Sequence, residues 1–370
     1  QVRSSGKFAS IQCLRAVAAA SVVLLHVMAE ASSIAGLAGR SHPLEPIRFA
    51  ALGAGVDLFF VISGFVMVHA SQRLFGIDGG WRRFLAHRIA RIVPLYWLTT
   101  TLFLLVGLVL PAVLNSDQPT AGQIAASYLF WPMTRTDGLA QPVYGLGWTL
   151  NYEMFFYALL AACMGFRRNI AVAIVGIALV VLVAAGPTLR PFGMPLAFWS
   201  DPLVLEFVVG SLIAMVHGAG WRLPLPGGIA LATAGVALLV ADQSAALPRV
   251  VAWGLPAGLL FAGIVLVERA PSRGWLGRAL VSIGDASYAL YLTHPFVIRP
   301  VGKLWLKMGL GELLPVWLFI VAAMALSIWA AMLVFRWVES PLTAALNTRL
   351  DRRGKARIWR GIGTDPSPPR

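Results

Sequence analysis

Two residues of the first long apolar run, Arg15 and His26, have side chains suited to chemistry. A guanidinium group binds phosphate or carboxylate, and a neutral imidazole accepts a proton near neutral pH. Eleven helical steps bring the two side chains to within about 20° of one face and separate them by roughly 16 Å along the axis, about half a bilayer core. Because a polar group inside hydrocarbon costs about 2.5 kcal/mol or more, we expect both to face protein, water or a ligand.

Other ionisable side chains in apolar runs are expected at the depth of His26. Asp57, Glu153 and His294 each fall a few residues inside the outer ends of their segments, and Glu206 lies slightly shallower. A carboxylate beside an imidazole orients it as a general base, so Asp57 or Glu153 is the expected partner of His26. The alternative is a structural polar network that ties the helices together, and it explains Glu206 equally well.

A second set of cations is expected at the cytoplasmic edge. Arg88 and Arg91 are three residues apart and therefore share a helix face, and Arg15 falls at the same level. Guanidinium groups gathered at a helix-lined mouth suit a phosphate-bearing ligand. The alternative is that these arginines only snorkel to the membrane surface and fix the topology.

The composition indicates the elements that must position these residues. The chain has 370 residues, of which 58% are hydrophobic and 12% charged, and its mean hydropathy is +0.76. A soluble protein has roughly twice that charged fraction. The sequence predicts an all-α, polytopic integral membrane bundle with about ten helices of membrane-spanning length. Their expected ranges are 12–31, 50–70, 92–113, 147–165, 169–186, 203–217, 226–241, 250–267, 281–299 and 313–337.

The distribution of charge predicts the orientation of this bundle. The net charge of +14 does not indicate nucleic-acid binding, because the basic clusters fall in alternate loops and in the C-terminal tail. This positive-inside pattern places both termini in the cytoplasm. Lys303 and Lys307, in an outer loop, depart from it. We expect a membrane domain over 8–341 and a basic cytoplasmic tail over 342–370, which contacts anionic lipid.

Cysteine usage and internal symmetry limit the remaining classes. Cys13 and Cys163 are the only two cysteines, so neither a structural disulfide nor a metal centre is expected. The chain has no evident internal repeat, which argues weakly against the commonest transporter folds. A secondary transporter or a flippase for a lipid-linked sugar stays the alternative function, since it would also place charges within the membrane.

The motifs in their order resemble those of the membrane-bound acyltransferase family 3, and in particular its exopolysaccharide O-acetyltransferases. The resemblance extends from about residue 8 to 341, nearly the whole chain. The matching pieces are Arg15-x10-His26, the stretch Gly55–Phe65, Arg88-x-x-Arg91 leading to Pro94-Leu95-Tyr96, Trp148-Thr149-Leu150 with Glu153, and Ser287-Tyr288-x-x-Tyr291-Leu292-x-His294.

The resemblance implies ten membrane helices and transfer of an acyl group, usually acetyl from acetyl-CoA, to a sugar hydroxyl. The family's essential arginine and histidine would be Arg15 and His26, and its arginine pair Arg88 and Arg91. It further implies a multi-pass protein of the bacterial inner membrane, whose acceptor is a glycan or a lipid-linked sugar. Many relatives carry an additional periplasmic hydrolase-like domain, which is not expected in this chain.

The residues and the resemblance together give one hypothesis for the donor. The anionic part of acetyl-CoA is expected to bind Arg15, Arg88 and Arg91, with Tyr96 beside them. Its pantetheine arm, comparable in length to the separation of Arg15 and His26, would carry the thioester towards His26. No metal takes part.

The chemical step is expected at His26. Oriented by Asp57 or Glu153, it would remove the proton from a sugar hydroxyl that attacks the thioester. In a covalent variant, His26 itself takes the acetyl group first. The acceptor side would be formed by Trp148, Asn151 and His294. The sequence assigns no oligomeric state.

Overall fold

The structure, a computed structural model, describes residues 6–37, 39, 49–109, 119–241, 247–267 and 274–362. Within these ranges the chain forms helices and turns, and the only extended pairing is an isolated bridge between Leu223 and Val267. The expected all-α fold is therefore confirmed for the described part of the chain.

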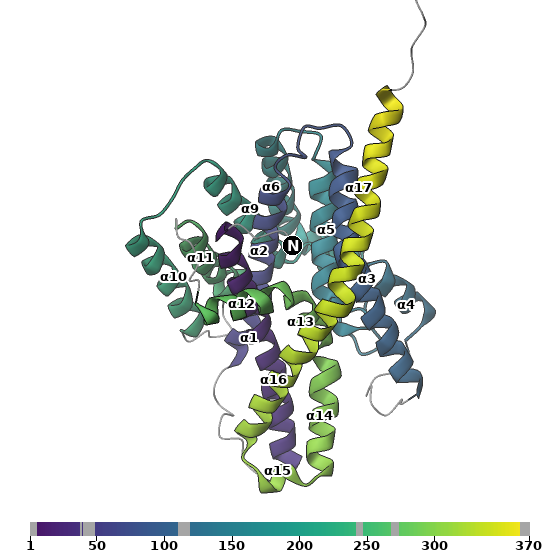
Figure 1. Ribbon diagram of the computed structural model, residues 1–370, viewed down its shortest axis with the longest axis vertical. Coiled ribbons are helices and arrows are strands. Elements are labelled where there is room, and N and C mark those ends of the chain that lie inside the picture. The colour runs from purple at the N-terminus through teal and green to yellow at the C-terminus, as the bar shows by residue number, and fades with distance from the viewer. Residues whose placement is uncertain are drawn as a thin grey trace, which may run out of the picture.

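Figure 1 shows the arrangement of the helices. The α-helices are α1 (Gly6–Leu37), α2 (Ala54–Ala70), α3 (Gly80–Val109), α4 (Ala121–Tyr128), α5 (Trp148–Ala162), α6 (Arg168–Ala184), α7 (Gly186–Leu189), α8 (Met194–Trp199), α9 (Leu205–Gly218), α10 (Leu225–Val240), α11 (Leu255–Val265), α12 (Trp275–Asp285), α13 (Ser287–Thr293), α14 (Pro295–Lys307), α15 (Leu310–Leu313), α16 (Val316–Val334) and α17 (Ser340–Ile362). Short 3₁₀ turns are η1 (Phe49–Gly53), η3 (Gly145–Gly147), η4 (Arg190–Phe192) and η5 (Pro202–Val204), and π-helical turns are η6 (Val250–Gly254) and η7 (Phe335–Glu339).

The centre of the bundle is formed by α1, α2 and α9. α2 packs against both other helices, and in its contact with α9 each helix has a glycine against the backbone of the other. A Cβ at Gly64 would meet the backbone carbonyl of Phe207, and a Cβ at Gly210 would meet that of Val61. Such close backbone approach is typical of membrane helix pairs, in which packing replaces the hydrophobic drive between helices.

The helix lengths agree with a membrane-embedded protein. Within the described residues, four helical stretches are long and apolar enough to cross a membrane: Ala9–Leu37, Ala51–Ala70, Gly80–Val109 and Val316–Leu350. A pair bent by 64°, Arg168–Ala184 and Gly186–Phe192, makes a fifth if it is one span. Shorter apolar helices cover Pro202–Gly218, Leu225–Val240 and Val250–Val265. The count of ten spans and the side of the termini stay predictions.

The single helix expected over 281–299 is wrong, because three helices occupy that region. α12 and α13 cross the molecule, and α14 then runs down beside α1 (Figure 1). Pro295 starts α14 and has no N–H to continue the ladder of α13. At Gly284, α12 lies against the backbone carbonyl of Gln12. These breaks bring α13 against α1, which places its two ends beside Arg15 and His26.

The C-terminal helices form one continuous rod through α16, η7 and α17 (Figure 1). Between His87 of α3 and Asn347 of α17, Nδ1 and Oδ1 are 2.9 Å apart and hydrogen-bonded. The boundary expected at 341/342 therefore lies inside a helix, and the first turns of the expected tail pack on the membrane domain.

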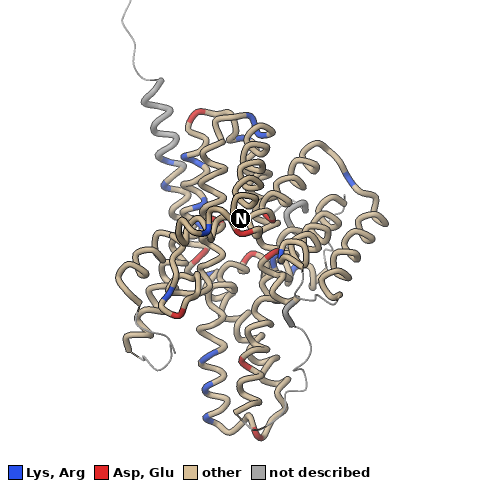
Figure 2. Tube along the Cα trace, turned by 180° about the vertical axis from the view of Figure 1, so that it is seen from behind, with Lys and Arg blue, Asp and Glu red and all other residues tan. Residues whose placement is uncertain are grey.

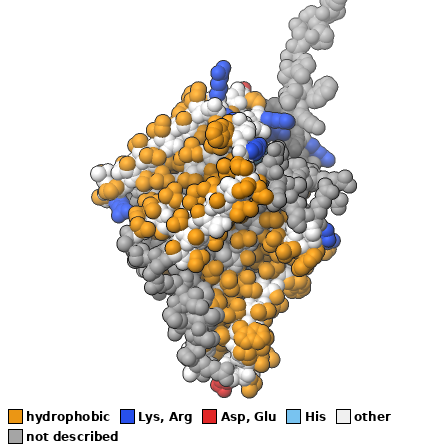
Figure 3. All heavy atoms as spheres, turned by 90° about the vertical axis from the view of Figure 1, so that its left-hand side faces the viewer, with side chains coloured by type: hydrophobic (Ala, Val, Ile, Leu, Met, Phe, Trp, Pro, Cys, Tyr) orange, Lys and Arg blue, Asp and Glu red, His pale blue; other side chains and the backbone are white. Residues whose placement is uncertain are grey.

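Charge is unevenly distributed over the structure. Figure 2 shows lysines and arginines gathered at one end, acidic and basic residues within the middle of the bundle, and basic residues along α14. Figure 3 shows a face covered mainly by apolar side chains, on the side of α10 and α11. On α10, Ile229, Val236 and Leu238 are exposed, as expected for a lipid-facing helix.

Candidate active site

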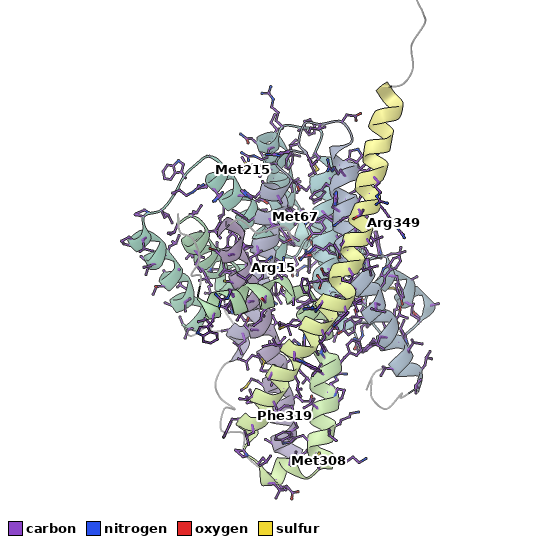
Figure 4. The ribbon with its side chains drawn as sticks, viewed as in Figure 1. Arg15, Met67, Met215, Met308, Phe319 and Arg349 are labelled. Atoms are coloured by element: carbon purple, nitrogen blue, oxygen red, sulfur yellow. The ribbon has the colours of Figure 1, made fainter. Side chains whose placement is uncertain are left out.

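A cavity of about 380 Å³, which we call the arginine pocket, contains Arg15, Arg88 and Arg91. The pocket lies between α1, α2, α3, α5, α13 and α17, and Figure 4 shows Arg15 at the centre of the bundle. The other polar residues lining it are Gln12, Ser63, His87, Thr149, Glu153, Tyr157, Ser287, Tyr288, Tyr291, Thr343 and Asn347. The structure thus brings together the three arginines that the spacing places at one level.

The arginines differ in how firmly the protein holds them. Arg15 Nε donates to Ser287 Oγ at 3.0 Å, which fixes the guanidinium against the start of α13. Arg88 Nε is buried and has no hydrogen-bond partner within the described part of the chain. A buried guanidinium N–H without an acceptor is costly, and a ligand oxyanion would satisfy it.

Glu153 lies in the arginine pocket, away from the position expected for it. Its Oε2 accepts a hydrogen bond from Tyr157 at 3.0 Å, and the Tyr157 hydroxyl is 3.2 Å from Ser63 Oγ. Trp148, five residues earlier on α5, lines the cavity that holds His26. Five helical steps correspond to about 7.5 Å and 140°, so Glu153 points into the other cavity and the expected contact with His26 is not formed.

Carboxylates offset much of the positive charge of this pocket. Glu153 and Glu339 lie within electrostatic range of Arg15, and Asp285 lies within range of Arg15 and Arg91. Glu339 is buried in the π-helical turn η7. A bound anion would therefore compete with protein carboxylates for these arginines, which would limit its affinity and permit its release.

A second cavity of about 1260 Å³, which we call the histidine cavity, holds His26 and His294. Their ring centroids are 4.9 Å apart. His26 Nδ1 lies 2.8 Å from the carbonyl oxygen of Val22, and His294 Nδ1 lies 3.1 Å from that of Leu290.

The hydrogen bonds of the two histidines define their tautomers. A carbonyl oxygen only accepts, so each Nδ1 carries the proton and each Nε2 has a free lone pair when the ring is neutral. The His26 side chain is exposed to the cavity, whereas His294 is fully buried and its Nε2 has no partner among the described residues. The pair therefore offers two proton-accepting nitrogens in one place.

The partner expected for His26, Asp57, is bound to Arg249 instead. Arg249 Nε donates to Asp57 Oδ1 at 3.1 Å and Nη2 donates to Oδ2 at 2.8 Å, a bidentate pair with the carboxylate fully buried. The structure thus pairs Asp57 with Arg249, and the hydrogen bond of His26 is made to the backbone carbonyl of Val22. Glu206 is buried close to Asp57 and Arg249, in keeping with the structural alternative.

Arg249 is a residue of this site that the sequence did not reveal. It lines the histidine cavity, and its guanidinium carbon lies 4.8 Å from the ring centroid of Trp253 and 5.8 Å from that of Trp148. A buried carboxylate in a membrane segment demands a cation, so Asp57 signals that such a partner exists. Several arginines could meet that demand, and only the fold selects Arg249.

Val56 and Tyr291 line both the arginine pocket and the histidine cavity. The Tyr291 hydroxyl accepts from Thr149 Oγ1 at 3.0 Å and donates to the carbonyl of Leu146 at 2.9 Å. These two side chains therefore form the boundary between the cavities. A molecule extended from the arginines to the histidines must pass them.

Two expected site residues lie outside both cavities. Tyr96 is buried against Phe130, and its ring closely approaches Gly147. Asn151 is buried on α5 but lines neither cavity. Trp148 and His294, in contrast, line the histidine cavity as expected of the acceptor side.

The side chains that commonly bind metals are scattered over the described part of the chain. No three His, Cys, Asp or Glu side chains in those ranges gather as metal ligands would. Cys13 and Cys163 are both free. The chemistry that this arrangement offers is proton transfer at the histidines and anion binding at the arginines.

Known proteins are similar to this sequence over most of its length. Residues 8–336 match the acyltransferase domain family Acyl_transf_3. The chain is similar to the exopolysaccharide production protein ExoZ of Rhizobium meliloti (strain 1021), with 34% identity over 319 residues that cover 82% of this chain and 91% of that protein. It is also similar to the acyltransferase MdmB of Streptomyces mycarofaciens, with 28% identity over 352 residues, 85% of this chain and 84% of that protein. No solved structure matches the chain. The protein therefore belongs to the membrane-embedded acyltransferase 3 family and is an O-acyltransferase.

Proposed function

We propose that this protein transfers an acetyl group from acetyl-CoA to a sugar hydroxyl of an exopolysaccharide or another cell-surface glycan. The observation that carries the proposal is the adjacency of the two cavities, which meet at Val56 and Tyr291. A pocket lined by arginines is thus separated from a pair of imidazoles by only these two side chains, an arrangement that suits a phosphate-bearing thioester and a base-activated hydroxyl. The similarity to the exopolysaccharide production protein ExoZ supports the class of acceptor.

The donor is assigned to the arginine pocket. The phosphates of acetyl-CoA bind Arg15, Arg88 and Arg91, and Arg88 Nε gains the acceptor that it lacks in the protein. Arg15 and His26 are roughly 16 Å apart along α1. A pantetheine arm extended over that distance brings the thioester past Tyr291 to His26.

The acceptor is assigned to the histidine cavity. The His26 Nε2 lone pair takes the proton of the sugar hydroxyl while the oxygen attacks the thioester carbonyl carbon. The C–O bond forms, the C–S bond breaks, and the proton on His26 passes to the departing CoA thiolate. General-base assistance of this kind contributes about 10²–10⁴-fold in rate. The Nε2 of His294 accepts a hydrogen bond from the acceptor, and Trp148 provides an apolar wall.

The setting that we propose is the bacterial inner membrane, with the arginine pocket opening to the cytoplasm. There it meets the cytoplasmic supply of acyl-CoA, and the histidine cavity faces the growing glycan. Direct transfer and an acetyl-His26 intermediate are both compatible with the free Nε2. Rapid quench after mixing with labelled acetyl-CoA alone distinguishes them, since only the covalent route labels the protein.

Label transfer tests the proposed function directly. Purified protein in proteoliposomes is mixed with acetyl-CoA radiolabelled in the acetyl group and with a de-O-acetylated exopolysaccharide. We expect alkali-labile label on the glycan with wild-type protein and none with His26→Ala. If wild-type protein neither labels the glycan nor hydrolyses acetyl-CoA, the proposal is contradicted. Uptake of the glycan without acetylation would favour a transporter.

A further inference from the structure

α14 carries three cations, Arg299, Lys303 and Lys307, at four-residue spacing. Residues four apart lie on one helix face, so these side chains form a basic stripe along α14. Figure 2 shows basic residues following one another along this helix, far from the basic end of the molecule. Lys303 and Lys307 are also the residues that depart from the charge pattern that orients the chain. The proposed function gives them no role.

Two of the three cations line the histidine cavity. Arg299 and Lys303 are part of its wall, whereas Lys307 is not. Glu30 lines the cavity as well and lies within electrostatic range of both. Because Glu30 follows His26 by four residues, it lies on the same face of α1, about 6 Å farther from Arg15.

The packing of α14 on α1 holds this charged group in place. A Cβ at Gly302 would come within 2.5 Å of Glu30 Oε1, so glycine permits the close approach of the two helices. Arg299 and Lys303 flank Gly302 and extend from exposed positions. Two cations, Arg299 and Lys303, thus lie near a single carboxylate, that of Glu30, which leaves an excess of positive charge in the cavity of the histidines.

The other cations of the cavity have partners of their own. Arg135 pairs with Asp137 at 2.8 Å, and Arg249 pairs with Asp57. Of the residues described as lining the cavity, Glu30 is the one carboxylate. The excess charge of this cavity is therefore located at Arg299 and Lys303.

We propose that the acceptor carries an oxyanion that Arg299 and Lys303 bind, about one sugar unit from the hydroxyl that reaches His26. This inference rests on the proposed function and names its substrate class. The oxyanion is either the carboxylate of an acidic sugar or the diphosphate of a lipid-linked saccharide, which offer the same charge-assisted hydrogen bonds. Glu30 competes with the ligand for the two cations and so permits release of the product.

The test measures binding in nanodiscs without acetyl-CoA. Three probes are compared: an oligosaccharide with one uronic acid, the same compound with its carboxyl reduced to an alcohol, and a neutral oligosaccharide on polyprenyl diphosphate. The variants are Arg299→Gln/Lys303→Gln and, as a matched control on the same helix face, Lys307→Gln. Arg299→Lys/Lys303→Arg keeps the charge, and thermal unfolding verifies the fold of each.

We expect wild-type protein to bind at least one anionic probe about tenfold or more tighter than the reduced probe. The double Gln variant loses this preference, and the charge-keeping variant and Lys307→Gln retain it. In turnover, the double variant raises the KM for that acceptor and leaves the KM for acetyl-CoA unchanged. Selectivity for the uronate probe identifies an acidic sugar, and selectivity for the diphosphate probe identifies a lipid carrier.

Equal wild-type affinity for all three probes would overturn the inference, and so would an anion preference that survives the double substitution. The proposed function fails separately. Acetylation of the carboxyl-reduced probe, without any preference for the anionic probes, contradicts only the inference. Selective binding of an anionic probe without acetylation of any glycan contradicts only the function.

Discussion

The arginine pocket and the histidine cavity lie side by side, but their charged groups are arranged differently. The arginine pocket, of about 380 Å³, is lined by three arginines and by Glu153, and Glu339 and Asp285 lie within electrostatic range of Arg15. In the histidine cavity, of about 1260 Å³, His26 is exposed and His294 is buried beside it, and the ion pair of Asp57 with Arg249 has its carboxylate buried in the wall. We propose that the arginine pocket binds the anionic donor reversibly and that the histidines of the other cavity move the proton.

The largest expected effect separates proton transfer from donor binding. His26→Ala removes the exposed Nε2 and should lower kcat for glycan acetylation by about 10²–10⁴-fold or more. CoA binding in the arginine pocket should be unchanged, because His26 does not line it. Stopped assays give kcat, and calorimetry in nanodiscs gives the affinity for CoA. Activity retained within a few-fold would remove His26 from the chemistry.

The next effect addresses the arginine pocket alone. Arg91→Ala should raise the KM for acetyl-CoA by about 10–100-fold, the value of a hydrogen bond to a charged group. Arg82→Ala is the matched control, since Arg82 lies on the same helix but outside the pocket, over the Trp81 ring. Initial rates at varied donor concentration measure both. Equal responses of the two variants would show that surface charge and not the pocket attracts the donor.

The third prediction concerns the wall of the histidine cavity. Asp57→Asn should destabilise the protein by about 1–3 kcal/mol, because it leaves Arg249 without its carboxylate. Thermal unfolding in detergent measures the loss. Arg249→Met in the same chain should restore part of it, and this double-mutant comparison isolates the pair. A stable Asp57→Asn protein with abolished turnover would instead return Asp57 to the chemistry.

The smallest effect tests the charge balance of the arginine pocket. Glu153→Gln removes a carboxylate that competes for the arginines and should tighten CoA binding by about threefold to tenfold, since a nearby like charge opposes the ligand. Tyr157→Phe, which removes the hydrogen bonds of the Tyr157 hydroxyl to Glu153 and Ser63 but keeps the carboxylate, is the control. Calorimetry with CoA measures both. A loss of kcat with unchanged CoA affinity would mean that Glu153 acts in the reaction.

The sequence predicts the helical class and the residues of the site better than their partners. Arg15, Arg88 and Arg91 line one pocket, in keeping with the common level expected for them, and the three-residue spacing places Arg88 and Arg91 on one helix face. His26 meets His294 although the expected helix over 281–299 is broken. The break at Pro295 is legible in the sequence, but the direction of the following helix is not.

The errors at the site have a common physical cause. The expected partners of His26 follow from depth along each helix alone, but rotation about the helix axis also decides which groups meet. Glu153 lies near the expected depth and yet points into the arginine pocket. Asp57 binds Arg249, which lies 192 residues later and whose position depends on tertiary packing alone.

Transfer across a sealed membrane tests most directly whether donor and acceptor reach the two cavities from opposite sides. Proteoliposomes are loaded with acceptor glycan inside, and radiolabelled acetyl-CoA is supplied only outside, with protein oriented so that the arginine pocket opens outwards. We expect acetylated glycan in the lumen while CoA accumulates outside. Acetylation only when donor and acceptor share one compartment would contradict this expectation.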